Sequence, residues 1–206
     1  MKTIKNIIFD LGGVFIAIDY SKTEKAFEDK GVSNFKEMFN QHHASDLFEK
    51  LETGKYSPED FFDAFRSEAR VELSNEEIES SWNAMLGNFY DEHLQWLETV
   101  KLRYNIYLFS NTNLIHYRAF QYIYKQQTGK TNLDDYFVKA YYSHDLGLRK
   151  PYPGSFRAVL QKEGLLAEET LFIDDTLKNI EGANSVGLNT IYLENAEDLI
   201  NKVANI

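Results

Sequence analysis

Cysteine is absent from this chain of 206 residues. Disulfide bonds, thiolate catalysis and zinc sites with sulfur ligands are therefore excluded. No apolar run approaches the roughly 18 residues that a membrane span needs. The first residues run directly into a short strand pattern and lack the apolar stretch of a signal peptide. We therefore expect a soluble, cytoplasmic protein that does not enter a membrane.

Basic residues are the minority, with 22 Lys and Arg against 32 Asp and Glu, which gives a net charge of −10. This balance argues against a nucleic-acid-binding surface. It also means that a phosphate-like substrate needs local positive charge from a metal ion or a lysine. The hydrophobic content of 43% is ample for a packed core. The length allows one large domain or a domain with a sizeable insertion.

Short apolar runs rich in strand-forming residues alternate with helical patterns over most of the chain. We expect strands at 4–10, 106–110, 137–143, 170–174 and 190–193, and helices at 92–103, 114–126, 154–163, 177–186 and 196–203. Strands that alternate with helices imply βαβ units and a parallel sheet. The sequence therefore predicts an α/β fold with a Rossmann-like, doubly wound parallel sheet.

The segment 20–90 differs from the rest of the chain. It holds no convincing strand, and its apolar residues recur at steps of three and four, as on one face of a helix. Ser57 before Pro58, and Ser74 before two glutamates, are typical helix starts. We interpret 20–90 as a helical cap inserted after the first strand and lying over the carboxyl ends of the strands. Residues 1–19 and 91–206 then form the α/β catalytic core.

Four short motifs place polar side chains at strand ends or before a helix. They contain Asp10, Ser110 with Asn111, Lys150, and the pair Asp174 and Asp175. In open α/β sheets, ligands bind just beyond the carboxyl ends of the strands. We therefore expect these side chains to meet at one edge of the sheet.

Phosphoryl transfer gives each of these groups a role. A carboxylate such as Asp10 can act as nucleophile and form an aspartyl-phosphate, which splits one hard displacement into two easier ones. Mg²⁺ prefers oxygen ligands, and Asp10, Asp175 and the backbone carbonyl of Gly12 supply them. Ser110 and the backbone amide of Asn111 can donate hydrogen bonds to phosphoryl oxygens. Lys150 can neutralise the charge that develops on those oxygens.

Taken in order, the four motifs resemble those of the haloacid dehalogenase superfamily of hydrolases, and the helical segment resembles that superfamily's first-type cap. The likeness runs over essentially the whole chain. Phe-Asp-Leu-Gly-Gly-Val, Ser-Asn-Thr-Asn and Asp-Leu-Gly-Leu-Arg-Lys-Pro are most similar to the sugar-phosphate phosphatases typified by a bacterial α-D-glucose-1-phosphate phosphatase. The resemblance implies Asp10 as nucleophile, Asp175 as Mg²⁺ ligand and Asp174 as a nearby acid that helps to hold the site. It further implies a small phosphorylated metabolite as substrate and a monomer or weak dimer.

One position departs from the family pattern. Superfamily phosphatases usually carry an aspartate two residues after the nucleophile, which protonates the leaving alcohol and then activates water. Here that position is Gly12, which has no side chain to move a proton. Acid–base catalysis contributes roughly 10²–10⁴-fold, so we expect a slower enzyme or a substitute group. Three alternatives stay open: Asp19 as the acid, His42 or His43 of the cap as the acid, or a substrate whose leaving group needs little protonation.

Two other functions stay open beside the phosphatase. A 2-haloacid dehalogenase also uses an aspartate nucleophile but no metal, and the paired carboxylates and the glycine at position 12 argue against it. A non-catalytic relative that binds a phosphorylated ligand is favoured only by Gly12. Asp174 and Asp175 also fit a structural role as caps of the helix that follows, and Asn179 fits either an orienting residue or an ordinary helix residue. Specificity is expected from the cap, where Tyr20, His42, His43 and Phe48 are candidates to face the leaving group, and Phe15, Tyr20 and Phe48 are candidates to line a cap pocket.

Overall fold

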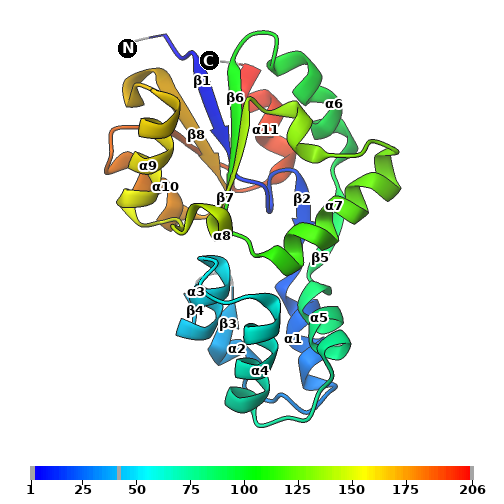
Figure 1. The fold of residues 1–206 in the computed structure, drawn as a ribbon. Coiled ribbons are helices and arrows are strands. Elements are labelled where there is room, and N and C mark those ends of the chain that lie inside the picture. The colour runs from blue at the N-terminus through cyan, green and yellow to red at the C-terminus, as the bar shows by residue number, and fades with distance from the viewer. Residues whose placement is uncertain (1–2, 41–42, 205–206) are drawn as a thin grey trace.

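The computed structural model describes residues 3–40 and 43–204. Its centre is a five-stranded sheet in the order β7-β6-β1-β8-β9. The strands are β1 (Asn6–Phe9), β6 (Asn105–Ser110), β7 (Lys139–Tyr142), β8 (Thr170–Asp174) and β9 (Asn189–Tyr192). Every neighbouring pair is parallel, as Figure 1 shows by the common direction of the arrows. The predicted parallel α/β sheet is confirmed.

Helices cover both faces of the sheet. On one face, α6 (Asp91–Val100), α7 (Leu114–Thr128) and α11 (Leu199–Ala204) share a hydrophobic core with Ile7 and Phe9 of β1. On the other face, α9 (Pro153–Glu163) and α10 (Leu177–Asn184) pack on Ile8 of the same strand. Because both faces of β1 are buried, its sequence is a continuous apolar run. The doubly wound arrangement is therefore also confirmed.

The predicted element boundaries need small corrections. The apolar run from 137 yields a shorter strand, because η1 (Leu133–Tyr136) precedes it and α8 (Ser143–Leu146) follows it at once. Ser143 is the first residue of α8, and its hydroxyl donates to the carbonyl of Thr112 and accepts from the amide of that residue, both at 2.9 Å. The predicted helix at 196–203 begins as η3 (Ala196–Asp198), and η2 (Ala167–Glu169) precedes β8. Among the described residues, no helix is long and apolar enough to cross a membrane.

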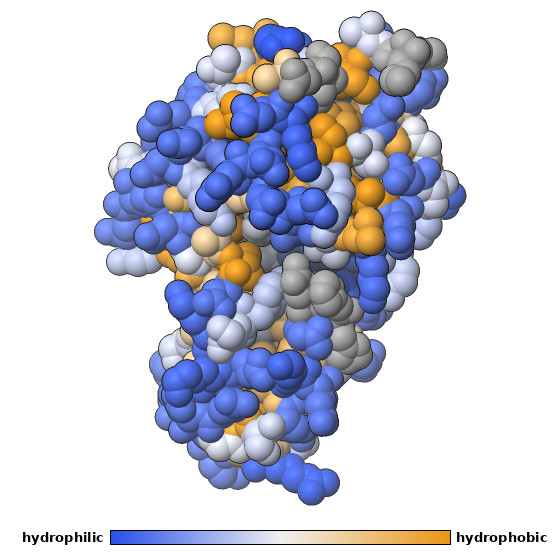
Figure 2. All heavy atoms as spheres, turned by 180° about the vertical axis from the view of Figure 1, so that it is seen from behind, coloured by the Kyte–Doolittle hydropathy of each residue, from blue (hydrophilic) through white to orange (hydrophobic). Residues whose placement is uncertain are grey.

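Five helices follow the first strand and lie beyond the carboxyl ends of the sheet strands (Figure 1). They are α1 (Tyr20–Glu28), α2 (Phe35–Met38), α3 (Asp46–Glu52), α4 (Pro58–Ala69) and α5 (Asn75–Asn83). Ser57 and Ser74 each form a capping box at the start of α4 and α5, as their sequence predicts. Phe48, Phe65 and Trp82 belong to a hydrophobic core distinct from the two cores of the sheet. The polar surface around these cores is visible in Figure 2.

The expectation that 20–90 holds no strand is wrong. β5 (Leu86–Phe89) pairs antiparallel with β2 (Ile16–Ile18), and β3 (Phe39–Asn40) pairs with β4 (His43–Ala44). These strands have two to four residues, too few for a period-two pattern to stand out. The β2–β5 ribbon forms between segments far apart in the sequence, so long-range pairing rather than local preference fixes it. This ribbon connects the five helices to the sheet.

Candidate active site

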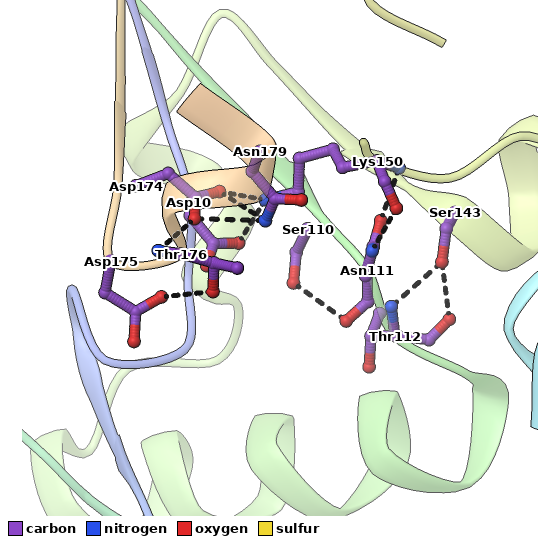
Figure 3. A network of polar contacts seen from close by, with 10 residues as sticks. All are labelled: Asp10, Ser110, Asn111, Thr112, Ser143, Lys150, Asp174, Asp175, Thr176 and Asn179. Carbon is purple, nitrogen blue, oxygen red and sulfur yellow. Dashed lines mark hydrogen bonds and ion pairs between the residues drawn. The ribbon is translucent and has the colours of Figure 1, made fainter. Parts of the chain in front are cut away.

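Three neighbouring strands bring the predicted carboxylates and hydroxyl together. Asp10 directly follows β1, Ser110 is the last residue of β6, and Asp174 is the last residue of β8. These strands are adjacent in the order β6-β1-β8, so their carboxyl ends meet at one point (Figure 3). Asp174 is fully buried and Asp10 is only 8% exposed. The site is thus built into the edge of the sheet.

Lys150 lies between the two buried aspartates. Its Nζ is 2.7 Å from Asp10 Oδ1 and 2.7 Å from Asp174 Oδ2, and the residue is 1% exposed. Burial by itself lowers the pKa of this ammonium group, but the charges of the two carboxylates outweigh burial, and the pKa is raised. A permanent positive charge therefore lies beside the carboxylate at the end of β1.

The side chain of Asn111 holds the backbone of Lys150. Asn111 Nδ2 donates to the carbonyl of Lys150 at 2.9 Å, and the amide of Lys150 donates to Asn111 Oδ1, also at 2.9 Å. The sequence pointed to the Asn111 backbone amide, whereas the structure also gives its side chain this positioning contact. Ser110 lies beside it, buried, with its hydroxyl 3.5 Å from the Asn111 carbonyl.

Hydrogen bonds occupy both carboxylate oxygens of Asp174. Oδ1 accepts from the backbone amide of Thr176 at 2.8 Å, and Asn179 Nδ2 lies 3.0 Å from each oxygen. Oδ2 also contacts Lys150. Asn179 therefore orients this carboxylate, one of the two roles left open for it. Asp174 is fully engaged in holding the site.

Asp175 lies at the Thr176 side of this network (Figure 3) and is half-buried. One of its oxygens accepts from the Thr176 hydroxyl at 3.2 Å. Asp10, Asp174 and Asp175 each place one carboxylate oxygen within 4.8 Å of the others. Burial and the neighbouring carboxylates raise the pKa of Asp10 to about 7, against the opposing charge of Lys150. The same two effects raise the pKa of Asp175 to about 6. Such crowded acids suit a hard divalent cation.

A cleft of about 320 Å³ opens over these residues, between the sheet edge and the helical insertion. The predicted residues that line it are Asp10, Gly12, Tyr20, Ser110, Asn111, Lys150 and Asp175. Two residues predicted to line a cap pocket are not on its wall. Phe15 and Phe48 are fully buried in hydrophobic cores, because the aromatic excess of this chain is used for packing. The suggestion that they line a cap pocket is therefore wrong.

Asp19, the first candidate for the acid, is exposed and lies outside the residues that line this cleft. It caps helix α1, and its Oδ1 accepts from the amide and hydroxyl of Ser21 at 3.1 and 2.5 Å. These hydrogen bonds lower the pKa of Asp19, so the carboxylate is committed to the cap. The structure does not support Asp19 as a proton donor. His42 lies outside the described residues, and only the backbone of His43 is described.

Several polar residues of the cleft wall were not predicted from the sequence. Glu49 and Glu52 of α3, Arg149 and Tyr152 line the cleft opposite or beside the carboxylates. His116 also lines it, stacked on Trp82 with ring centroids 4.4 Å apart. Arg149 stands next to Lys150 in the sequence, but no local pattern identifies partners about a hundred residues away.

Comparisons with known proteins agree with the fold. The pattern of the haloacid dehalogenase-like hydrolase family matches residues 4–187. A D-ribitol-5-phosphate phosphatase of Bacteroides thetaiotaomicron is 33% identical over 196 residues, which are 95% of this chain and 94% of that protein.

Two solved structures superpose closely on this chain. One is the HAD family enzyme bt-2542 of Bacteroides thetaiotaomicron, an aspartate-to-alanine variant with magnesium and inorganic phosphate. It has a TM-score of 0.85 and 33% identity, and the match covers 91% of this chain and 93% of that one. The other is described as a predicted HAD-like family hydrolase of Porphyromonas gingivalis. It has a TM-score of 0.88 and 29% identity, and the match covers 99% of this chain and 98% of that one. The resemblance seen in the sequence is confirmed, and this chain belongs to the haloacid dehalogenase-like hydrolase family.

Proposed function

We propose that this protein is a Mg²⁺-dependent phosphatase that acts on a small phosphorylated metabolite through an aspartyl-phosphate on Asp10. One observation carries the proposal. A buried lysine contacts the carboxylate at the end of β1 while two further carboxylates lie within 4.8 Å of it. This arrangement offers a nucleophile, a cation site and a positive charge to one phosphoryl group. The 33% identical relative that is a D-ribitol-5-phosphate phosphatase supports the same reaction.

The residues at the sheet edge fit Mg²⁺. Asp10, Asp175 and the backbone carbonyl of Gly12 would hold it, since all three line the cleft and oxygen is the ligand that Mg²⁺ prefers. Asp174 would support them from behind, because its oxygens already accept hydrogen bonds from protein groups. When bound, the cation would let an anionic carboxylate approach an anionic phosphoryl group.

The protein's own groups supply the nucleophile and hold the phosphoryl group. The Asp10 carboxylate attacks phosphorus, and the bond to the leaving oxygen breaks while that oxygen takes a proton from water. A second water then attacks the aspartyl-phosphate, gives its proton to solvent, and releases phosphate and the free carboxylate. Ser110 and the Asn111 amide donate hydrogen bonds to the phosphoryl oxygens. Lys150 neutralises the charge on the same oxygens. In a chain with a net charge of −10, this lysine supplies local positive charge for an anionic substrate.

Residues 20–90 are proposed to act as a cap on a core formed by 1–19 and 91–206. The insertion has its own hydrophobic core and contributes Tyr20, Glu49 and Glu52 to the cleft wall, which supports this division. A polar wall suits a hydroxylated leaving group such as a sugar or polyol. The proposal leaves Asp19 out of the reaction, because its carboxylate caps α1.

Phosphate and chloride release distinguish the candidate reactions. The purified protein is assayed on p-nitrophenyl phosphate with and without Mg²⁺, and on 2-chloropropionate. We expect phosphate release that disappears with a chelator and in Asp10→Asn. Chloride release without metal would instead identify a dehalogenase, and ligand binding without either product would identify a phospho-ligand-binding relative. The expected cytoplasmic location and monomeric or weakly dimeric state stay predictions, the second open to sedimentation analysis.

A further inference from the structure

Arg149 joins the helical insertion to the segment that carries Lys150. Its Nη1 donates to Glu49 Oε1 at 2.7 Å, and its Nε lies 2.9 Å from Glu52 Oε2. Both carboxylates belong to α3 of the insertion, whereas Arg149 lies between α8 and α9 at the sheet edge. These contacts therefore cross from one side of the cleft to the other.

The contact between Arg149 and Glu52 is the shielded part of this junction. The Arg149 side chain is 16% exposed and that of Glu52 is 8% exposed, whereas Glu49 is considerably more open. The Nε–H group is not aligned on the Glu52 oxygen, so the two groups interact as charges rather than through a hydrogen bond. Charges so far from solvent are weakly screened, and either one left alone is costly to bury.

Two further contacts seat α3 on the same segment. Gly54, just after α3, has φ +67°, and a Cβ added there would lie 2.1 Å from the backbone oxygen of His144. The Tyr152 hydroxyl donates to Glu49 Oε1 at 3.3 Å. The end of α3 therefore rests directly on the segment 144–152, at its beginning, middle and end.

Lys150 follows Arg149 within that segment. From the sheet side, Asn111 binds the amide and carbonyl of Lys150. From the insertion side, the neighbouring guanidinium is held by α3. The lysine backbone is thus fixed by the sheet on one side and by the insertion on the other, while its Nζ reaches Asp10 and Asp174.

We propose that Arg149 is a positioning residue, whose ion pair with Glu52 couples the seating of α3 on segment 144–152 to the placement of Lys150. The phosphoryl group then meets a correctly placed lysine only while the insertion covers the cleft. This inference rests on the proposed phosphatase function for the role of Lys150. The coupling between the two segments is a property of the chain itself.

Kinetics test the coupling with Glu52→Gln, Arg149→Met, Arg149→Lys and the double variant Glu52→Gln/Arg149→Met. On p-nitrophenyl phosphate with Mg²⁺, Glu52→Gln and Arg149→Met should each lose about 10- to 100-fold in kcat/KM, because the loss of one charge leaves the other unpaired and frees α3 from segment 144–152. Arg149→Lys keeps the positive charge and should lose less. Inhibition by inorganic phosphate should weaken in parallel. Phosphate has no leaving group, so its affinity depends on the phosphoryl-binding groups, Lys150 among them. Residues that act as a unit are not additive, so the double variant should be no worse than the poorer single variant.

Arg66→Met is the matched control. Arg66 also bonds to neighbouring groups of the insertion, Asp63, Leu73 and Asn75, but the described structure gives it no contact with the sheet. Its loss should lower thermal stability and leave kcat/KM and phosphate inhibition unchanged. If Arg149→Met does not fold, Glu52→Gln and Arg149→Lys carry the test.

Amide hydrogen exchange supplies a readout that does not depend on turnover. Glu52→Gln should accelerate exchange in α3 and in segment 144–152 together. Faster exchange in α3 alone would overturn the coupling, as would additive losses in the double variant. Slower turnover of D-ribitol 5-phosphate with normal p-nitrophenyl phosphate kinetics and phosphate inhibition would make the pair a leaving-group subsite and also overturn it. A wild-type protein without phosphatase activity would refute the proposed function, and the exchange result would still decide the coupling.

Discussion

Gly12 and Gly13 follow Asp10, and the structure gives them different constraints. A Cβ at Gly12 would lie 3.2 Å from Ile18 Cγ1, so a side chain at this position would require a small shift of Ile18. Gly13 has φ +69°, and a Cβ there would lie 2.2 Å from Asp175 Oδ2. A side chain at 13 would therefore displace the carboxylate that we propose as a metal ligand.

Replacing Gly13 by alanine should weaken Mg²⁺ binding by at least about tenfold, because the new methyl group moves Asp175. A residue with a side chain at this φ also costs about 1 kcal/mol of backbone energy. Gly129→Ala is the control, since Gly129 has φ +71° and open space around it. Calorimetric titration with Mg²⁺ measures the affinity. Equal affinity in both variants would show that Asp175 does not hold the cation.

Asp19→Ala tests the role of this residue as a helix cap. The exposed carboxylate accepts two hydrogen bonds from Ser21, so its loss should lower the melting temperature. Rates on p-nitrophenyl phosphate and on an alkyl phosphate should both stay within about twofold of wild type. A sharp fall in the rate on the alkyl phosphate alone would show that Asp19 is the general acid, a role that Gly12 cannot fill because it has no side chain.

At the scale of elements, helix α7 links the sheet to the insertion through His116 in its first turn. The ring stacks on Trp82 of α5, and Nε2 lies 3.1 Å from the Trp82 carbonyl. Because a carbonyl only accepts, Nε2 carries the proton. Burial lowers the pKa of His116 to about 4, although the Trp82 carbonyl opposes this shift. The imidazole is therefore neutral in the folded protein at neutral pH.

The pH dependence of stability should report this buried histidine. Its pKa is lower in the folded chain than in the unfolded chain, so the unfolded state takes up the proton first as pH falls. The His116 contribution is therefore fully present above about pH 6.5 and is lost between 6.5 and 4, by up to about 3 kcal/mol. Urea unfolding of wild type and His116→Gln across this range measures the difference. Parallel curves for the two proteins would contradict a neutral His116.

Short apolar runs allowed the sheet to be predicted, because a strand such as β1 is buried on both faces. Helical patterns allowed the covering helices to be predicted, because a helix such as α7 buries one side. Strand ends then located Asp10, Ser110 and Asp174 at one edge, since neighbouring parallel strands end together. The β2–β5 ribbon could not be predicted, because its two strands are short and find each other only in the folded chain. The partners of Arg149 could not be predicted for the same reason, because ion pairs between distant segments leave no local pattern in the sequence.

At the scale of the whole molecule, the carboxylates of the site make the stability of the fold depend on pH. The pKa of Asp10 is about 7 and that of Asp175 about 6 in the metal-free fold, both raised from their ordinary 3.8 mainly by burial. Between about pH 4 and 7 the folded chain therefore holds more protons than the unfolded chain. The contribution of these groups to stability is present below pH 4 and is lost as pH rises through 7.

Metal-free protein should accordingly have a lower melting temperature at pH 8 than at pH 5.5, and Mg²⁺ should reverse most of the loss at pH 8 by binding the folded state. Asp10→Asn should be less sensitive to both pH and Mg²⁺. Scanning calorimetry of the two proteins with chelator and with Mg²⁺ checks this. If the melting temperature of the wild type were the same with chelator and with Mg²⁺, there would be no cation site at Asp10.

The covalent step on Asp10 is the central claim, and trapping it is the most direct test. Wild-type protein is mixed with p-nitrophenyl phosphate and Mg²⁺, quenched in acid within the first turnover and digested for mass spectrometry. We predict a phosphoryl group on the peptide that carries Asp10, formed as fast as nitrophenol is released and absent in Asp10→Asn. Phosphate release with no phosphoryl group on that peptide, or with the group on another residue, would contradict the account.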